Sequence, residues 1–134
     1  MAYWYKLYSD WSKDVRDFRK LRVWEKAHQL VLVVYELSAT FPESERYGLS
    51  SQLRWASVSI PANIAEGCGR TTKTEFARFL DIAMGSASEV EYLLYLAGDL
   101  EFIDDATCIA ASEQVVEVKR MLAGLLTQLR SQEN

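Results

Sequence analysis

The chain has 134 residues, which suits a single domain that can bury a hydrophobic core without disulfides or metals. Hydrophobic residues make up 49% of it and charged residues 25%, a balance typical of a globular protein and not of a disordered chain. No apolar run reaches the roughly 18 residues of a membrane span, and Lys6 and Asp10 interrupt any signal-peptide core. The sequence therefore argues against the membrane and secreted classes, and we expect a cytoplasmic protein.

Positive and negative charges are unevenly distributed along the chain, whose net charge is −4. Residues 1–78 contain 12 Lys and Arg against 9 Asp and Glu, whereas residues 79–134 contain 3 against 10. This asymmetry predicts a basic surface on one part of the fold and an acidic surface on another. It could also orient copies of the chain head to tail.

Residues 1–17 are rich in aromatic side chains and form a separate extension in the predicted domain organisation. Apolar residues recur there every three or four positions, at Trp4, Tyr8, Trp11, Val15 and Phe18. The spacing predicts an amphipathic helix that continues toward the next helix and packs on its own bundle or on a neighbouring copy. The alternative is a disordered leader, or an upstream start codon that the cell does not use.

Helical spacing continues over the first half of the remaining chain. A first helix is predicted from Leu21 to Phe41, because the residue before a proline disfavours the helical conformation. A second helix is predicted from about Leu49 to Gly67, where Gly67 and Gly69 offer the left-handed conformation that closes a helix.

Capping signals mark two further helices. Residues 72–75, Thr-Lys-Thr-Glu, form a capping box that begins a third helix reaching about Leu100, and Asp104 is a good N-cap for a fourth. Sustained heptads and short connections predict an all-α protein, an antiparallel up-down four-helix bundle over residues 18–131. The predicted core positions are Trp24, Ala27, Val31 and Val34 in the first helix; Leu49, Leu53, Ala56, Ile60 and Ile64 in the second; Phe76, Leu80, Ala83, Ala87, Val90, Leu94 and Ala97 in the third; and Cys108, Ala111, Val115, Val118, Leu122, Leu125 and Leu129 in the fourth.

Pro61 lies inside the second helix, where it removes a backbone donor and its ring collides with the carbonyl of Ser57. We expect a kink there, and its cost of about 3 kcal/mol in an ordinary helix must be offset. Polar side chains near the kink are candidates for a network that bridges to the third helix or to a neighbouring chain. They are Ser57, Ser59, Asn63, Glu66 and Arg70.

The second helix also carries a second apolar stripe, distinct from its core stripe, made of Trp55, Val58, Ala62 and Ala65. A helix that is apolar on two faces is buried on two faces. The stripe therefore predicts an oligomer interface, although it does not define the number of copies.

Several short motifs occur together: Trp-Glu-Lys-Ala at residues 24–27, Arg-Tyr-Gly-Leu at 46–49, and Ser-Ile-Pro-Ala-Asn-Ile-Ala-Glu-Gly at 59–67. Over residues 18–100 the chain resembles the four-helix-bundle proteins encoded in intervening sequences of bacterial 23S ribosomal RNA genes. The resemblance implies a homopentameric, barrel-like assembly and a distant likeness to the accessory protein of diversity-generating retroelements. It implies no established biochemical activity.

No combination of residues predicts a catalytic, cofactor or metal site. Glu25 and His28 have the Glu-x-x-His spacing of di-metal bundles, but His28 is the only histidine, so we expect a surface imidazole beside Trp24. Asn63, Glu66 and Arg70 lack a nucleophile–base pair, which argues against an enzyme. Cys68 and Cys108 form no CxxC motif and are expected to be buried, reduced thiols.

Two hypotheses for the function remain. The first is a non-enzymatic, self-assembling module that binds itself or an unidentified protein. The alternative is an accessory protein that binds RNA or DNA, although Asp14, Asp17 and Glu25 interrupt its basic residues and the calculated pI is about 5.0. The candidate nucleic-acid contacts are Lys13, Arg16, Arg19, Lys20, Arg22, Lys26, Arg70, Lys73 and Arg78.

Overall fold

A computed structural model describes residues 17–131, and within this range all regular structure is helical, which confirms the all-α prediction. Four long helices follow one another along the chain, with short 3₁₀ turns before the first of them and after it. The helices are α2 (Arg22–Ser38), α3 (Leu49–Cys68), α4 (Lys73–Asp99) and α5 (Asp105–Ser131), and the turns are η1 (Phe18–Lys20) and η2 (Glu43–Glu45).

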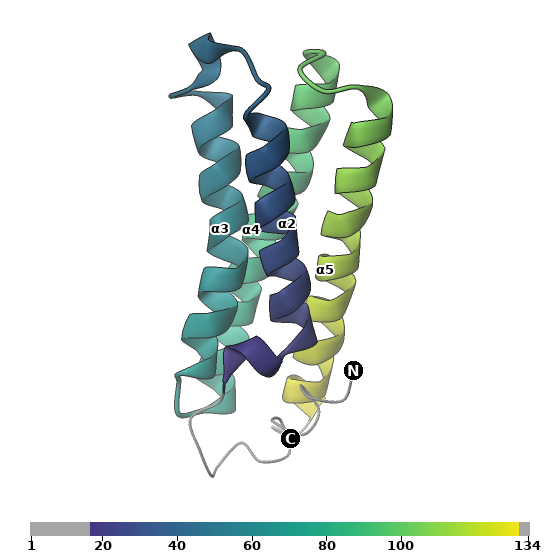
Figure 1. The fold of residues 1–134 in the computed structure, drawn as a ribbon. Helices are drawn as coiled ribbons and strands as arrows, with labels where there is room; N and C mark the ends of the chain where they lie inside the picture. The colour runs from purple at the N-terminus through teal and green to yellow at the C-terminus, as the bar shows by residue number, and fades with distance from the viewer. Residues whose placement is uncertain (1–16, 132–134) are drawn as a thin grey trace.

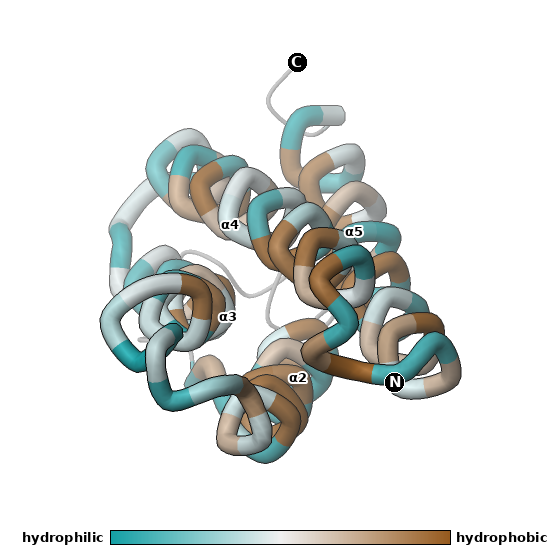
Figure 2. Tube along the Cα trace, turned by 90° about the horizontal axis from the view of Figure 1, so that it is seen from above, coloured by the Kyte–Doolittle hydropathy of each residue, from teal (hydrophilic) through white to brown (hydrophobic). Residues whose placement is uncertain are grey.

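The four helices form an up-down bundle, as predicted. Each is joined to the next by a short connection and runs antiparallel to it (Figure 1). The view down the bundle shows α2, α3, α4 and α5 in that order around a common centre, and α5 also packs against α2 to close the bundle (Figure 2). The α2–α3 side therefore lies opposite the α4–α5 side.

The predicted heptad positions form the core. All the predicted positions of α3 and α4 are buried, and Leu53, Ile60, Leu80 and Leu94 are fully inaccessible to solvent. Trp24 is the first residue of the α2 stripe and Cys108 the first of the α5 stripe, and both are half-buried. The spacing of apolar residues thus predicts which face of each helix turns inward.

Both predicted N-caps are confirmed. The Thr72 hydroxyl accepts a hydrogen bond from the backbone N–H of Glu75 at 3.1 Å, and the Asp104 carboxylate accepts one from the N–H of Thr107 at 2.7 Å. The hydrogen bond from Thr107 holds the pKa of Asp104 below its ordinary value, because it stabilises the ionised carboxylate. Local side-chain chemistry therefore defines where α4 and α5 begin.

The end of the first helix was predicted wrongly. α2 ends at Ser38, three residues before Phe41, because backbone bonds from Thr40 to Leu37 and from Phe41 to Ser38 close tight turns in place of helical ones. The Thr40 hydroxyl also donates to the Leu37 carbonyl at 2.7 Å. Phe41 nevertheless packs in the core, since a turn can place it there as well as a helix.

The role predicted for Gly67 and Gly69 at the end of α3 was also wrong. No glycine of residues 17–131 has a positive φ, and Gly69 has a φ of −85°. Gly67 lies within α3, where a Cβ atom would be 2.8 Å from Cδ1 of Phe76. Its function is to let α4 approach closely, not to adopt a left-handed conformation.

α3 runs through Pro61 without interruption, so the proline lies within one helix and not between two. The kink itself stays a prediction. Of the helices in the described range, none has both the length and the apolar composition needed to cross a bilayer.

The chain enters the bundle through η1, where the Asp17 carboxylate accepts a hydrogen bond from the backbone N–H of Arg19 at 3.0 Å. Leu21 then adopts an extended conformation before α2 begins. Leu21 therefore separates α2 from the residues before it, and the amphipathic helix expected in the N-terminal extension stays a prediction. Residues 1–16, which carry most of the predicted aromatic stripe, lie outside the described residues.

Candidate interaction surface

The second apolar stripe of α3 faces solvent. Trp55 is 75% exposed and Val58 is 36% exposed, while Ala62 is exposed and Ala65 half-buried. Spacings of three and four residues place these side chains along one outer face of α3. Because the opposite face is packed in the core, α3 is apolar both inside and outside the bundle.

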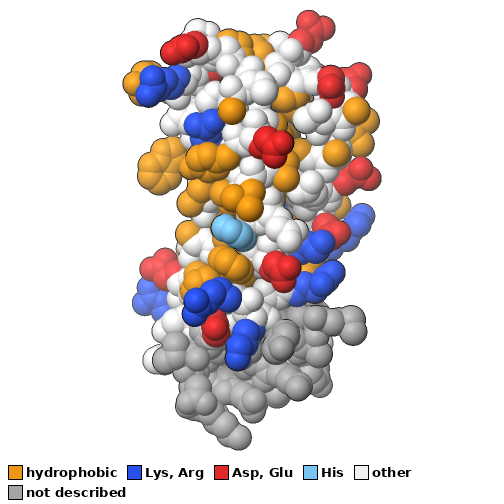
Figure 3. Space-filling model, in the orientation of Figure 1, with side chains coloured by type: hydrophobic (Ala, Val, Ile, Leu, Met, Phe, Trp, Pro, Cys, Tyr) orange, Lys and Arg blue, Asp and Glu red, His pale blue; other side chains and the backbone are white. Residues whose placement is uncertain are grey.

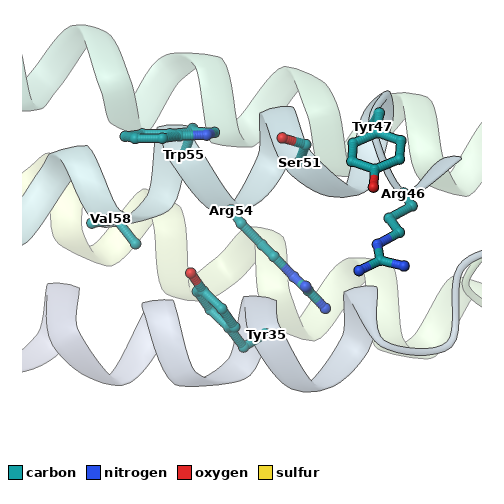
Figure 4. A pocket seen from close by; sticks show the side chains of 7 residues that line it. All are labelled: Tyr35, Arg46, Tyr47, Ser51, Arg54, Trp55 and Val58. Atoms are coloured by element: carbon teal, nitrogen blue, oxygen red, sulfur yellow. The ribbon is translucent and has the colours of Figure 1, made fainter.

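A groove runs beside this stripe, between α3 and α2, and encloses about 430 Å³. In Figure 3, hydrophobic side chains gather on the α3 side of this face of the molecule. Figure 4 shows Tyr35 rising from α2 beside Arg54, with Trp55 and Val58 on the same helix as Arg54. The lining residues are Tyr35, Arg46, Tyr47, Ser51, Arg54, Trp55 and Val58.

Two arginines give the groove its charge. The Arg54 Nε donates a hydrogen bond to the Ser38 hydroxyl at 2.8 Å, and its guanidinium lies 4.8 Å from the ring centroid of Tyr35. The Arg46 guanidinium lies 5.5 Å from the ring centroid of Tyr47. Within residues 17–131, neither arginine has a carboxylate within ion-pairing distance. The groove therefore combines uncompensated positive charge with exposed aromatic rings.

The sequence predicted the stripe but missed the groove. Tyr35 comes from α2, Arg46 and Tyr47 from the connection, and Arg54 from α3, so only the packing of α2 on α3 brings them together. One signal was available, because Arg-Tyr at 46–47 and Arg-Trp at 54–55 each place an arginine beside an aromatic residue.

The polar residues near Pro61 form hydrogen bonds inside the bundle. The Ser57 hydroxyl donates to the Arg54 carbonyl at 2.9 Å, and the Asn63 amide donates to the Ser59 carbonyl at 2.7 Å. The hydroxyl oxygens of Ser59 and Ser86 lie 2.8 Å apart and join α3 to α4. The Ser59–Ser86 contact can fix the register of α3 against α4.

Glu66 and Arg70 are separate from that cluster. They form an ion pair of 3.2 Å on the surface, at the end of α3, and the Arg70 guanidinium lies 4.6 Å from the ring centroid of Phe79. The predicted network is therefore divided into a half-buried group and an exposed pair.

Several of the predicted nucleic-acid contacts are paired with carboxylates of the same chain. Lys20 and Arg22 are exposed near the start of α2 and Lys73 is half-buried at the start of α4, while Lys13 and Arg16 lie outside the described residues. The paired cations are Arg19 with Asp17 at 3.0 Å, Lys26 with Glu117 at 3.2 Å, Arg70 with Glu66 at 3.2 Å, and Arg78 with Glu75 at 3.3 Å. Neighbouring carboxylates reduce the positive potential that phosphates would meet.

His28 lies on the surface and stacks on Trp24, with ring centroids 5.0 Å apart and planes inclined by 6°, as expected. No group of three or more His, Cys, Asp or Glu side chains in the described part of the chain is arranged to hold a metal ion. Neither cysteine forms a disulfide in the described part of the chain; Cys68 is buried, whereas Cys108 is half-buried and donates to the Leu94 carbonyl at 3.4 Å.

The fold and sequence can now be compared with known proteins. The sequence profile of the 23S rRNA-intervening sequence protein family matches residues 19–124. The chain belongs to this family. The match covers all of α2, α3 and α4 and most of α5, so the apolar stripe and the groove lie within the family region.

A solved structure supports the fold of this family member. A protein of unknown function from the S23 ribosomal protein family of Bacteroides thetaiotaomicron is similar, with a TM-score of 0.74 and 24% sequence identity. The similarity covers 78% of this chain and 95% of the other. At this identity the likeness shows the fold alone. None of the curated proteins compared matches the chain.

Proposed function

We propose that this protein is a non-enzymatic, self-assembling module of the cytoplasm, whose copies associate through the outer face of α3. The family resemblance leads us to expect five copies. The proposal is supported chiefly by the exposure of Trp55, at 75%, on a helix whose other face already packs in the core. Large aromatic side chains are enriched at the centres of protein interfaces and rarely left in water without a function.

Three further features of the same face support association. Tyr47 is 88% exposed and Tyr35 46% exposed, so the apolar surface extends beyond α3 on to its neighbours. Ala62 and Ala65 are small enough to let a helix of another copy approach closely. The rings of Tyr35 and Tyr47 also lie beside arginines, and arginine and tyrosine are both enriched at interfaces.

The test is the mass of the protein in solution. The full chain at micromolar concentration should give a particle several times heavier than its 15.3 kDa monomer by light scattering and native mass spectrometry. Replacing Trp55 by Glu should weaken association by about 2 kcal/mol or more, roughly thirtyfold in the dissociation constant. Leu32→Gln is the matched control, because Leu32 is also a large exposed apolar residue, at 57%, but lies outside the groove. A monomeric wild-type protein would refute the proposal.

The alternative, that RNA or DNA binds the basic residues, has weaker support because several of these residues are paired with carboxylates. Exposed ion pairs of this kind are weak, so phosphates could still compete for the cations. An electrophoretic titration with structured RNA at two salt concentrations decides the question. Binding that weakens steeply with salt would favour the alternative, and no binding at low salt would leave the assembly module.

A further inference from the structure

A second exposed aromatic surface lies on α4, away from the α3 stripe. Tyr92 is 59% exposed and Tyr95 is 65% exposed, and the helical repeat places Asp99 on the same face. The Asp99 carboxylate has no ion pair within residues 17–131. We refer to Tyr92, Tyr95 and Asp99 as the α4 tyrosine face.

The α4 tyrosine face and the groove lie at the same end of the bundle. The amide of Gln52 in α3 donates to the Glu89 carboxylate in α4 at 3.3 Å. Because α3 and α4 run antiparallel, residues that precede Gln52 lie level with residues that follow Glu89. Arg46, six residues before Gln52, is therefore at about the height of Tyr95, which lies six residues after Glu89, and Asp99 lies one helical turn beyond Tyr95.

The two surfaces also lie on different sides of the bundle and differ in charge. The groove opens between α2 and α3, whereas α4 belongs to the opposite side (Figure 2). Arg46 and Arg54 lack a carboxylate partner in the described range, and Asp99 lacks a cation. Residues 79–134, which include most of α4 and all of α5, are acidic, with 3 Lys and Arg against 10 Asp and Glu.

We propose that the groove between α2 and α3 of one copy binds the α4 tyrosine face of a second copy, with Arg46 facing Asp99. The inference rests on the proposed self-assembly and adds the partner surface. Copies placed side by side with their bundles parallel bring the end of the groove at Arg46 and Tyr47 level with Tyr95. Complementary charge then determines the orientation and the register. The contact is heterologous, since each copy uses two different patches, and such contacts can build rings.

The first experiment exchanges the charges. Arg46→Glu and Asp99→Arg should each raise the dissociation constant of the assembly by roughly tenfold or more, and the double variant should recover most of the loss. Arg46 is the better residue to replace, because the Arg54 Nε also donates a hydrogen bond to the Ser38 hydroxyl. Arg120→Glu, an exposed arginine of α5 with no ion pair in the described part of the chain, is the control and should keep the wild-type mass.

The second experiment mixes two variants that each lack one surface. Trp55→Glu disrupts the groove surface, and Tyr95→Glu disrupts the α4 tyrosine face. Each variant alone should be a monomer by light scattering and should keep its helical content by circular dichroism. Their mixture should form a one-to-one dimer and nothing larger, because only one intact pair of surfaces remains. Assembly of Tyr95→Glu alone at the wild-type mass would overturn the inference while leaving self-assembly intact. A monomeric wild-type protein would instead remove both.

Discussion

Glu101 follows α4 and its cap residue Leu100, and it lies in the left-handed region of backbone conformation, with a φ of 62°, where a glycine is usual. The backbone N–H of Glu101 donates to the Gly98 carbonyl, and that of Phe102 donates to the Ala97 carbonyl at 2.9 Å. These two bonds form a Schellman motif. The fold therefore requires the left-handed conformation at a residue whose Cβ atom disfavours it.

Replacing Glu101 by Gly should stabilise the protein by about 0.5–1 kcal/mol. Glycine removes the steric cost of the left-handed conformation, and this gain exceeds the loss that comes from the greater conformational entropy of the unfolded chain. Urea unfolding at one fixed protein concentration measures the difference. Glu101→Ala is the control, because it keeps a Cβ atom and should bring no such gain. A loss of stability in the glycine variant would contradict the explanation.

Gly67 permits a close approach between α3 and α4. A Cβ atom at this position would lie 2.8 Å from Phe76 Cδ1 and 3.0 Å from Phe79 Cβ. Gly67→Ala should therefore destabilise the protein by about 1–3 kcal/mol, because the aromatic side chains must shift. Gly124→Ala is the control, since nothing lies within 4 Å of its Cβ position and alanine favours a helix. Thermal unfolding should separate the two variants in opposite directions.

At the scale of single elements, the start of α5 depends on pH. The bond from the Thr107 N–H keeps the pKa of Asp104 below its ordinary value, so the ionised cap stabilises the folded state. This contribution is fully present above the ordinary pKa of aspartate and is lost as the pH falls through the lower folded-state pKa.

Asp104→Asn keeps a hydrogen-bond acceptor but loses the charge. The wild type should therefore be more stable than the variant near neutral pH, and the difference should shrink as the pH falls below about 4. Urea unfolding at several pH values tests this expectation. Glu113→Gln, at an exposed position of α5 whose side chain makes no hydrogen bond or ion pair with the described residues, is the control for the loss of a carboxylate from α5.

Element boundaries follow from local chemistry only where a side chain makes the decisive bond. Thr72 and Asp104 accept hydrogen bonds from the first turns of their helices, and both caps are evident from sequence. The end of α2 is different, because the backbone chooses between helical and tighter turns at nearly equal cost. The proline at position 42 indicated only that the helix could not continue past it.

For the whole molecule, the N-terminal extension is the part whose contribution is open to a direct test. A chain beginning at Asp17 should have a lower melting temperature or contain fewer copies per particle than the full chain. The reason is that burial of each large aromatic side chain contributes roughly 1.5–3 kcal/mol, and the removed stripe contains three. An equal melting temperature and an equal number of copies per particle would show that the extension does not pack on the bundle or on a neighbour.

The order of apolar and polar residues is sufficient to predict four helices, their inward faces and the bundle they form. These properties depend on neighbours three or four positions apart, which the sequence displays directly. The second stripe of α3 was evident for the same reason, and the structure places Trp55 and Val58 on its outer surface.

Other features require the packed molecule, because they join residues that are distant in sequence. Lys26 pairs with Glu117 across α2 and α5, Arg130 with Asp81, and Gln52 with Glu89. The groove beside Trp55 likewise exists only where α2 meets α3. No local pattern specifies which residues of neighbouring helices meet, since that choice minimises exposed apolar area over the whole bundle.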